Sequence, residues 1–225
     1  MNLRDLAEGA LDAYGESTWT LAFDTEVLLC HKPEGSILAI RGTEGEAQDV
    51  ISDLSVYWSP WTTEDGRSLL LHHGFAQAAR GVVKLVKSTF ERDCPIYLTG
   101  HSLGGAVASI AAAMLFDQGW NISGVATFGS PRPGDRSFSR WLDRQPIKVI
   151  RVVRAWDPVT AVPFLLWGFR HVGGLVYLFP GGSSLEPSWW LRARHRISGI
   201  FRPKEYGRHH AMAGYLAGCP DLDLD

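Results

Sequence analysis

A serine flanked by glycines is the most chemically suggestive feature of the sequence. Residues 100–104 read Gly-His-Ser-Leu-Gly, after a short apolar segment and before an alanine-rich one. A serine on a tight turn between a strand and a helix holds its hydroxyl clear of both elements, and the glycines let the two elements approach closely. No lysine follows in the glycine-rich turn, which excludes a phosphate-binding loop. We therefore expect Ser102 to be a nucleophile.

A nucleophilic serine requires a base, and the base requires a carboxylate that orients it. On a parallel sheet of this type the chain order is serine, acid, histidine. Asp157 is the best candidate for the acid because it follows the apolar segment 147–153 and precedes a proline, at the end of an expected strand. Asp135 and Asp143 lie in or beside an expected surface helix.

The base must follow Asp157 in the chain, where several histidines are available. His195 lies in an Arg-rich run that we expect to face solvent, and His171 precedes an expected strand, the wrong end for a parallel-sheet site. His209 and His210 are expected to open the last helix, between residues 205 and 216. Residue spacing alone does not distinguish His209 from His210.

Helix-like and strand-like segments alternate through most of the chain. This pattern predicts an α/β fold, specifically a mostly parallel central sheet with helices on both faces. Sites in such folds lie at the carboxyl ends of the strands. The expected helices are 3–11, 75–90, 103–118, 137–144 and 205–216, the expected strands are 26–30, 36–40, 95–99, 124–128, 147–153 and 172–179, and 180–187 is expected to be a loop.

Length and composition narrow the class of protein. The 225 residues suit one domain spanning residues 1–225. A formal net charge of −2 argues against a nucleic-acid partner. The three cysteines are widely spaced and predict neither a disulfide framework nor a metal site, and nothing in the sequence calls for a cofactor.

With no visible signal peptide and no transmembrane segment, we expect a cytoplasmic or otherwise soluble protein, and secretion stays open.

Several further motifs, in the same order along the chain, resemble those of the class 3 lipase family, the fungal-lipase-like branch of the α/β hydrolases. The resemblance covers roughly residues 25–216. Its motifs are Ile-Arg-Gly-Thr at 40–43, Asp-Val-Ile-Ser-Asp-Leu at 49–54, His-His-Gly-Phe at 72–75, Thr-Gly-His-Ser-Leu-Gly-Gly-Ala at 99–106, Thr-Phe-Gly-Ser-Pro-Arg-Pro-Gly at 127–134, Arg-Ala-Trp-Asp-Pro-Val at 154–159 and His-Ala-Met-Ala-Gly-Tyr at 210–215.

The resemblance implies a role for each site residue. Ser102 would be the nucleophile, Asp157 the orienting acid and His210 the base, because the family histidine stands before a Met and a Tyr at this spacing. The backbone N–H groups of Thr43 and Leu103 would form the oxyanion hole, and the Thr43 hydroxyl could add a donor. One such donor typically stabilises the transition state by about 3 kcal/mol.

The resemblance does not settle the roles of several other segments. Residues 44–49 are polar and offer little apolar surface for a lid, and the aromatic stretch 56–61 is either a pocket wall or core. The segment 163–169 is a candidate acyl-binding wall or interface-facing loop, with burial in the core equally compatible. Residues 188–196 combine tryptophans with arginines and could touch an anionic lipid interface.

The expected function is therefore hydrolysis of carboxylic esters in lipid-like substrates, triacylglycerols or related molecules, through an acyl-enzyme. The partners are a lipid or ester small molecule and, transiently, a lipid interface. One alternative is a carboxylesterase for small or aryl esters, similar to feruloyl esterases. The other is a non-catalytic relative that binds a lipid or a protein.

Overall fold

The computed structural model describes residues 1–15, 19–21, 25–42, 57–188, 190 and 209–224. Eight strands of this part form one sheet in the order β1-β2-β3-β6-β7-β8-β9-β10. The four central pairings, from β3 to β9, are parallel, and the pairings at both edges are antiparallel. The strands are β1 (Trp19–Thr20), β2 (Glu26–Lys32), β3 (Gly35–Ile40), β6 (Ile96–His101), β7 (Ile122–Phe128), β8 (Val149–Arg154), β9 (Gly174–Phe179) and β10 (Gly182–Leu185).

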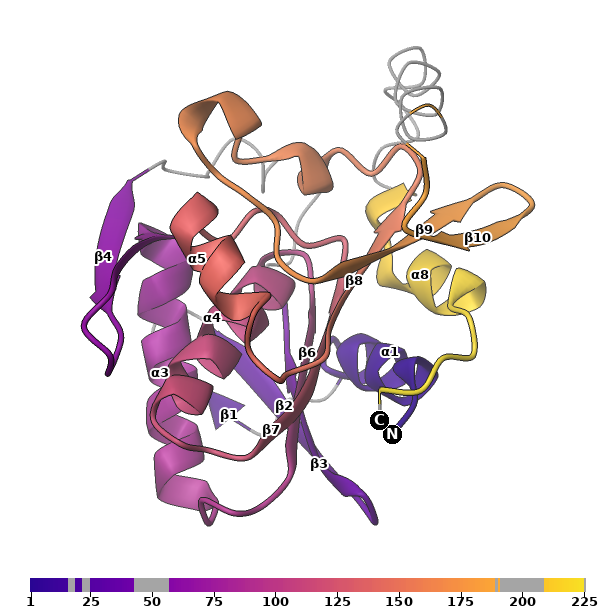
Figure 1. Cartoon of the computed structure of the whole chain (residues 1–225). Coiled ribbons are helices and arrows are strands. Elements are labelled where there is room, and N and C mark those ends of the chain that lie inside the picture. Colours follow the sequence, from indigo (N-terminus) through magenta and orange to yellow (C-terminus); the bar gives the residue numbers. More distant parts are fainter. Residues whose placement is uncertain (16–18, 22–24, 43–56, 189, 191–208, 225) are drawn as a thin grey trace.

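Helices cover both faces of this sheet, as the sequence predicts (Figure 1). One face carries α3 (His73–Thr89) and α4 (Leu103–Asp117), and α5 (Arg136–Leu142) lies on the same side. The other face carries α1 (Leu3–Asp12) and α8 (Met212–Gly218), which pack against each other. The architecture is that of an α/β hydrolase, with short 3-10 helices η2 (Val159–Ala161) and η3 (Leu165–Trp167) after β8.

The helix after the serine owes its composition to its position. From Gly104 to Leu115 every residue of α4 is buried, because the helix lies between the sheet and α3. A helix buried on all sides is apolar all round, and its alanines allow close packing against the strands. By contrast, α1 is amphipathic and begins with a capping box in which Asn2 and Asp5 bond each other's backbone N–H.

Some expected elements differ from the structure. A hairpin of β4 (Trp58–Thr62) and β5 (Ser68–His72) was not expected, and β10 replaces part of the expected loop 180–187. His209 and His210 are helical, but Ala211 separates them from the last helix, which begins at Met212, so they do not open it as expected. The polar segment 44–49 lies outside the described residues, as do 189 and 191–196 of the tryptophan–arginine stretch.

Candidate active site

The turn at Ser102 has the strained geometry that the sequence predicts. Ser102 lies between β6 and α4 with φ 55° and ψ −130°, a left-handed φ that is costly for a residue with a side chain. Its N–H donates to the carbonyl of Phe128 at the end of β7, 2.9 Å away. Its hydroxyl is buried and has no hydrogen-bond partner among the described residues. The fold therefore holds this side chain in place without using its hydroxyl structurally.

The glycines around the turn are dictated by contact distances. A Cβ on Gly104 would lie 2.1 Å from the carbonyl oxygen of Ile40, and one on Gly100 would lie 2.5 Å from the backbone of Gly104. A Cβ on Gly105 would meet the carbonyl oxygen of Gly100 at 2.9 Å. Each of these neighbours is backbone and has little freedom to move. The close approach of β3, β6 and α4 therefore requires glycine at these positions.

The structure brings the two other expected triad residues into contact. Asp157 lies three residues beyond β8, and its Oδ2 is 2.9 Å from Nδ1 of His210. Both side chains are buried. A carboxylate only accepts hydrogen bonds, so Nδ1 carries the hydrogen and Nε2 is left with its lone pair. This Nε2 is buried and has no hydrogen-bond partner among the described residues. His210 is thus in the tautomer that a general base requires.

Two further groups hold the Asp157 carboxylate. The N–H of Val159 donates to Oδ1 at 2.9 Å, and the hydroxyl of Tyr215 donates to Oδ2. Burial, together with the neighbouring carboxylate, raises the pKa of Tyr215 well above its usual value, so this hydroxyl stays protonated. Gly129, at the end of β7, leaves room for the cluster, since a Cβ there would lie 2.7 Å from Oδ2 of Asp157.

Sequence reasoning left His209 and His210 equivalent until the resemblance was considered, and the geometry separates them. The ring of His209 packs edge-on against Trp156 with centroids 4.8 Å apart, and its carbonyl accepts from Nη1 of Arg154. His171 lies elsewhere, with Nε2 donating to the carbonyl of Thr160. It is the ring of His210 that bonds the Asp157 carboxylate. His195 lies outside the described residues.

The oxyanion segment is described only up to Gly42. Thr43, the expected donor, lies outside the described residues. A Cβ on Gly42 would lie 3.1 Å from Cβ of Ser102, so the end of this segment reaches the serine directly. Leu103 is the first residue of α4, where a backbone N–H has no acceptor within the helix. The described part is thus compatible with the expected pair of donors.

Two residues that sequence reasoning did not single out adjoin the site. His101 lies between Gly100 and Ser102 and is buried, and its ring centroid is 4.5 Å from that of His210. Tyr14, just beyond α1, bonds Nδ1 of His101 at 2.7 Å. Local sequence patterns do not predict this contact, because Tyr14 and His101 are 87 positions apart in the chain.

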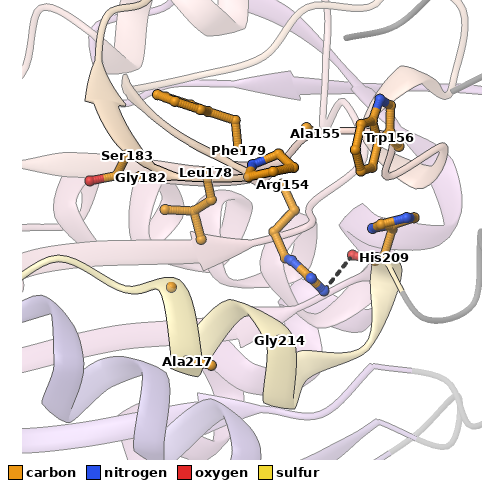
Figure 2. A pocket seen from close by; sticks show the side chains of 12 residues that line it. Arg154, Ala155, Trp156, Leu178, Phe179, Gly182, Ser183, His209, Gly214 and Ala217 are labelled. Atoms are coloured by element: carbon orange, nitrogen blue, oxygen red, sulfur yellow. Dashed lines mark hydrogen bonds between the residues drawn. The ribbon is translucent and has the colours of Figure 1, made fainter. Parts of the chain in front are cut away.

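A cavity of about 520 Å³ lies beside the triad, between α8 and the ends of β8, β9 and β10 (Figure 2). Arg154 extends across it to the carbonyl of His209, and Trp156 forms part of its wall. Ser102, Asp157 and His210 do not line this cavity. Its lining includes the chain neighbours Trp156 and His209 of the acid and the base. The described residues contain no cluster of three or more His, Cys, Asp or Glu placed to hold a metal ion.

The fold and the Ser-Asp-His order define the class of protein as an α/β hydrolase. The model of the family "Lipase (class 3)" matches residues 37–167, more than half of the chain. The chain therefore belongs to the class 3 lipase family, and the resemblance seen in the motifs is confirmed.

Individual relatives agree with this assignment. A "Secreted mono- and diacylglycerol lipase 1" of Fusarium solani is 35% identical over 127 residues, 54% of this chain and 34% of that protein. A chloroplastic "Phospholipase A(1) DAD1" of Arabidopsis thaliana is 32% identical over 114 residues, 49% of this chain and 24% of that protein. The native propeptide complex of the Rhizomucor miehei lipase is 26% identical with a TM-score of 0.61, covering 71% of this chain and 55% of that one.

The matched segments are shorter than the relatives themselves. Across the first curated relatives, the match spans 34%, 43% and 30% of their length. The comparisons thus establish the family and the fold of the matched part.

Proposed function

We propose that this chain is a serine hydrolase that cleaves carboxylic ester bonds of lipid-like substrates through an acyl-enzyme on Ser102. The observation that carries the proposal is the buried Asp157–His210 pair beside the strained Ser102 turn. Membership of a lipase family supports a lipid ester as the substrate. Curated relatives are named as acting on mono- and diacylglycerols or as a phospholipase A(1), so an acyl ester of glycerol is the shared chemistry.

The proposed reaction uses each group for one task. Nε2 of His210 takes the proton of Ser102 as its oxygen attacks the ester carbonyl carbon. The resulting oxyanion is held by the backbone N–H groups of Thr43 and Leu103. His210 then gives the proton to the departing alcohol. Water attacks the acyl-enzyme in the same way, which releases the carboxylic acid and returns the proton to Ser102.

Asp157 assists without accepting the proton. Its carboxylate keeps the hydrogen of His210 on Nδ1 and stabilises the imidazolium that forms during attack. The bonds from Val159 and Tyr215 fix the carboxylate so that it does not turn away when the charge develops.

The experiment that tests the proposal compares three single variants on a short-chain nitrophenyl ester. We expect Ser102→Ala and His210→Ala each to lower kcat by about 10⁴-fold or more, because the triad acts as a unit. His209→Ala is the matched control, since the ring of His209 packs against Trp156, and it should retain kcat within about tenfold. Full turnover by Ser102→Ala, or loss in His209→Ala alone, would contradict the proposal.

We further propose that the exposed segment Phe164–Trp167 meets the lipid surface. Leu166 is 96% exposed, and Phe164, Leu165 and Trp167 are each about half exposed, whereas Phe169 is buried in a stack on Trp58. Of the expected alternatives for 163–169, core packing thus holds only for Phe169 among the large apolar side chains. The segment lies beyond the carboxyl ends of the parallel strands, on the side of the site (Figure 1).

The backbone beneath this apolar tip is firmly held. Nη1 of Arg170 donates to the carbonyls of Leu165 and Phe169, and Nη1 of Arg132 donates to the carbonyl of Pro163 at 2.6 Å. A preorganised apolar tip inserts into lipid without an ordering cost.

No helix of the described residues is long and apolar enough to cross a membrane. Two relatives are named as secreted lipases, which favours the secretion that the sequence left open and gives no support to a cytoplasmic location.

A further inference from the structure

A chain of hydrogen bonds connects the N-terminal helix to the candidate base. The hydroxyl of Tyr14, two residues beyond α1, lies 2.7 Å from Nδ1 of His101. Nε2 of the same imidazole lies 2.6 Å from the backbone carbonyl oxygen of His210. At the other end, the N–H of Gly42 bonds the hydroxyl of Tyr14. Three separate parts of the site are thus joined through two side chains.

The positions of the hydrogens follow from the chemistry of the partners. A carbonyl oxygen only accepts, so Nε2 of His101 must carry the hydrogen that it donates to His210. In the neutral ring Nδ1 then accepts, and the Tyr14 hydroxyl is its donor. That hydroxyl oxygen is in turn free to accept from Gly42. Every bond of the chain therefore has a defined direction, from Gly42 to His210.

Both side chains are held in the required protonation state by their surroundings. Burial, reinforced by the neighbouring His210, lowers the pKa of His101 to about 3. Burial likewise raises the pKa of Tyr14 to about 12. His101 is therefore neutral and Tyr14 protonated at neutral pH. A neutral His101 also avoids repulsion when the ring of His210, 4.5 Å away, becomes an imidazolium during catalysis.

We propose that Tyr14 and His101 are a positioning pair that holds the backbone of His210 and the end of the oxyanion segment at fixed places around Ser102. Asp157 fixes the imidazole of His210 through Nδ1, and His101 fixes the same residue through its carbonyl. Two anchors define the orientation of Nε2 better than one. Gly42, which adjoins Thr43, lies both against Tyr14 and against Ser102. This inference rests on the proposed function, since it assigns His210 as the base.

The central experiment replaces His101 with side chains of different reach. The amide nitrogen of glutamine extends about as far as Nε2 of histidine, whereas asparagine extends only as far as Nδ1. We expect His101→Leu to lower kcat by about 100-fold, the typical effect of misplacing a catalytic group by about 1 Å, with KM for the soluble ester nearly unchanged. His101→Gln should recover most of this loss, and His101→Asn should not.

A purely structural role would give a different pattern. If His101 only fills space, activity should follow the thermal unfolding midpoint of each variant, and Gln and Asn should be equivalent at equal stability. Equal kcat for these two variants at equal stability would overturn the proposal, as would a loss confined to KM.

Substitution of Tyr14 provides a second, independent test. Tyr14→Phe removes the hydroxyl and keeps the ring, and we expect kcat to fall about tenfold, within the range for one lost hydrogen bond that orients a reacting group. The matched control is Tyr177→Phe, a buried tyrosine in the separate cluster around β9, which should leave kcat unchanged. Combined with His101→Leu, the Tyr14→Phe loss should be smaller than in the wild-type background. Fully multiplicative losses would show that the two residues act separately.

A spectroscopic readout separates failure of this inference from failure of the proposed function. ¹⁵N NMR of the histidine rings should show His101 neutral, with its hydrogen on Nε2, down to pH 5 and irrespective of turnover. If the wild-type protein hydrolyses no ester but shows this signal, the proposed function fails while the hydrogen-bonded pair stands. A His101 ring protonated on Nδ1, or charged at pH 5, would overturn the inference even in an active enzyme.

Discussion

Two buried atoms of the site have no hydrogen-bond partner among the described residues, and they are the two between which the proton would pass. Oγ of Ser102 and Nε2 of His210 are both buried and unpaired within this part of the chain. A buried polar group without a partner typically costs about 1–3 kcal/mol. By contrast, Asp157 and His101 are each held by two or more bonds. Within the site, the polar atoms left without a partner are therefore the two reacting atoms.

His101 should make the stability of the protein depend on pH. Its pKa is about 3 in the folded protein and near 6.5 in the unfolded chain. Between these pH values the unfolded state binds more protons than the folded state, so the free energy of unfolding rises with pH. The contribution of His101 to stability therefore declines as the pH falls below about 6.5. The contribution of this group is at most about 1.4 kcal/mol per pH unit.

The check is urea unfolding at pH 7.5 and pH 5.0 for the wild-type protein and His101→Gln. We expect the wild type to lose more stability than the variant on acidification, because glutamine does not titrate. Equal losses in both proteins would mean that His101 is not held neutral by the fold.

At the scale of elements, the approach of β3, β6 and α4 should tolerate no side chain at Gly104. The Cβ of Gly104→Ala would collide with the backbone of Ile40 at 2.1 Å. We expect this substitution to destabilise the protein by more than about 3 kcal/mol, or to prevent folding. The measurement is the urea midpoint of each purified variant.

Gly81→Ala is the matched control, because this glycine lies inside α3 and, among the residues that the structure describes, the nearest atoms to an added Cβ belong to Leu21, at 3.8 Å. Alanine is the better helix former, so this variant should gain about 0.5–1 kcal/mol. A Gly104→Ala protein as stable as Gly81→Ala would be incompatible with the close packing described above.

Elements near the motif could be predicted from sequence because local patterns define them. The apolar strand before Ser102 and the alanine-rich helix after it have their expected places. The hairpin of β4 and β5 was missed because Pro60 interrupts its first strand, and proline usually marks an edge or a non-strand. The strand β10 was missed because Gly181 and Gly182 indicate a loop.

The contacts of the site could be predicted only in part. Chain order and strand ends suffice to nominate Ser102 and Asp157, since parallel strands share one carboxyl edge. They do not separate His209 from His210, which are adjacent, and only the geometry shows which of them bonds Asp157. The contact between Tyr14 and His101 joins positions far apart in the chain. This contact depends on how α1 packs on the sheet, and local sequence patterns do not predict that packing.

At the scale of the whole molecule, the apolar tip at Phe164–Trp167 should control binding to lipid surfaces. Leu166→Asp replaces the most exposed large apolar side chain of the segment with a charge. Burying a leucine side chain contributes about 1.5–3 kcal/mol, so we expect the affinity for phosphatidylcholine vesicles to fall by about tenfold or more. Turnover of a soluble short-chain ester should be unchanged.

Leu185→Asp is the matched control, as Leu185 is also exposed but lies on β10, outside the tip. It should leave vesicle binding intact in a flotation assay. If both variants bind vesicles as the wild type does, the segment does not meet the lipid. A loss of soluble-ester turnover in Leu166→Asp would instead assign the segment to the substrate pocket.

Under the proposed function, His210 and Asp157 activate the hydroxyl of Ser102. The most direct test is reaction of the folded protein with a fluorophosphonate probe, read by intact mass and peptide mapping. We predict a single adduct on the peptide that contains Ser102, absent in Ser102→Ala and formed far more slowly in His210→Ala. A wild-type protein that takes up no probe, or an adduct that persists in Ser102→Ala, would contradict the claim.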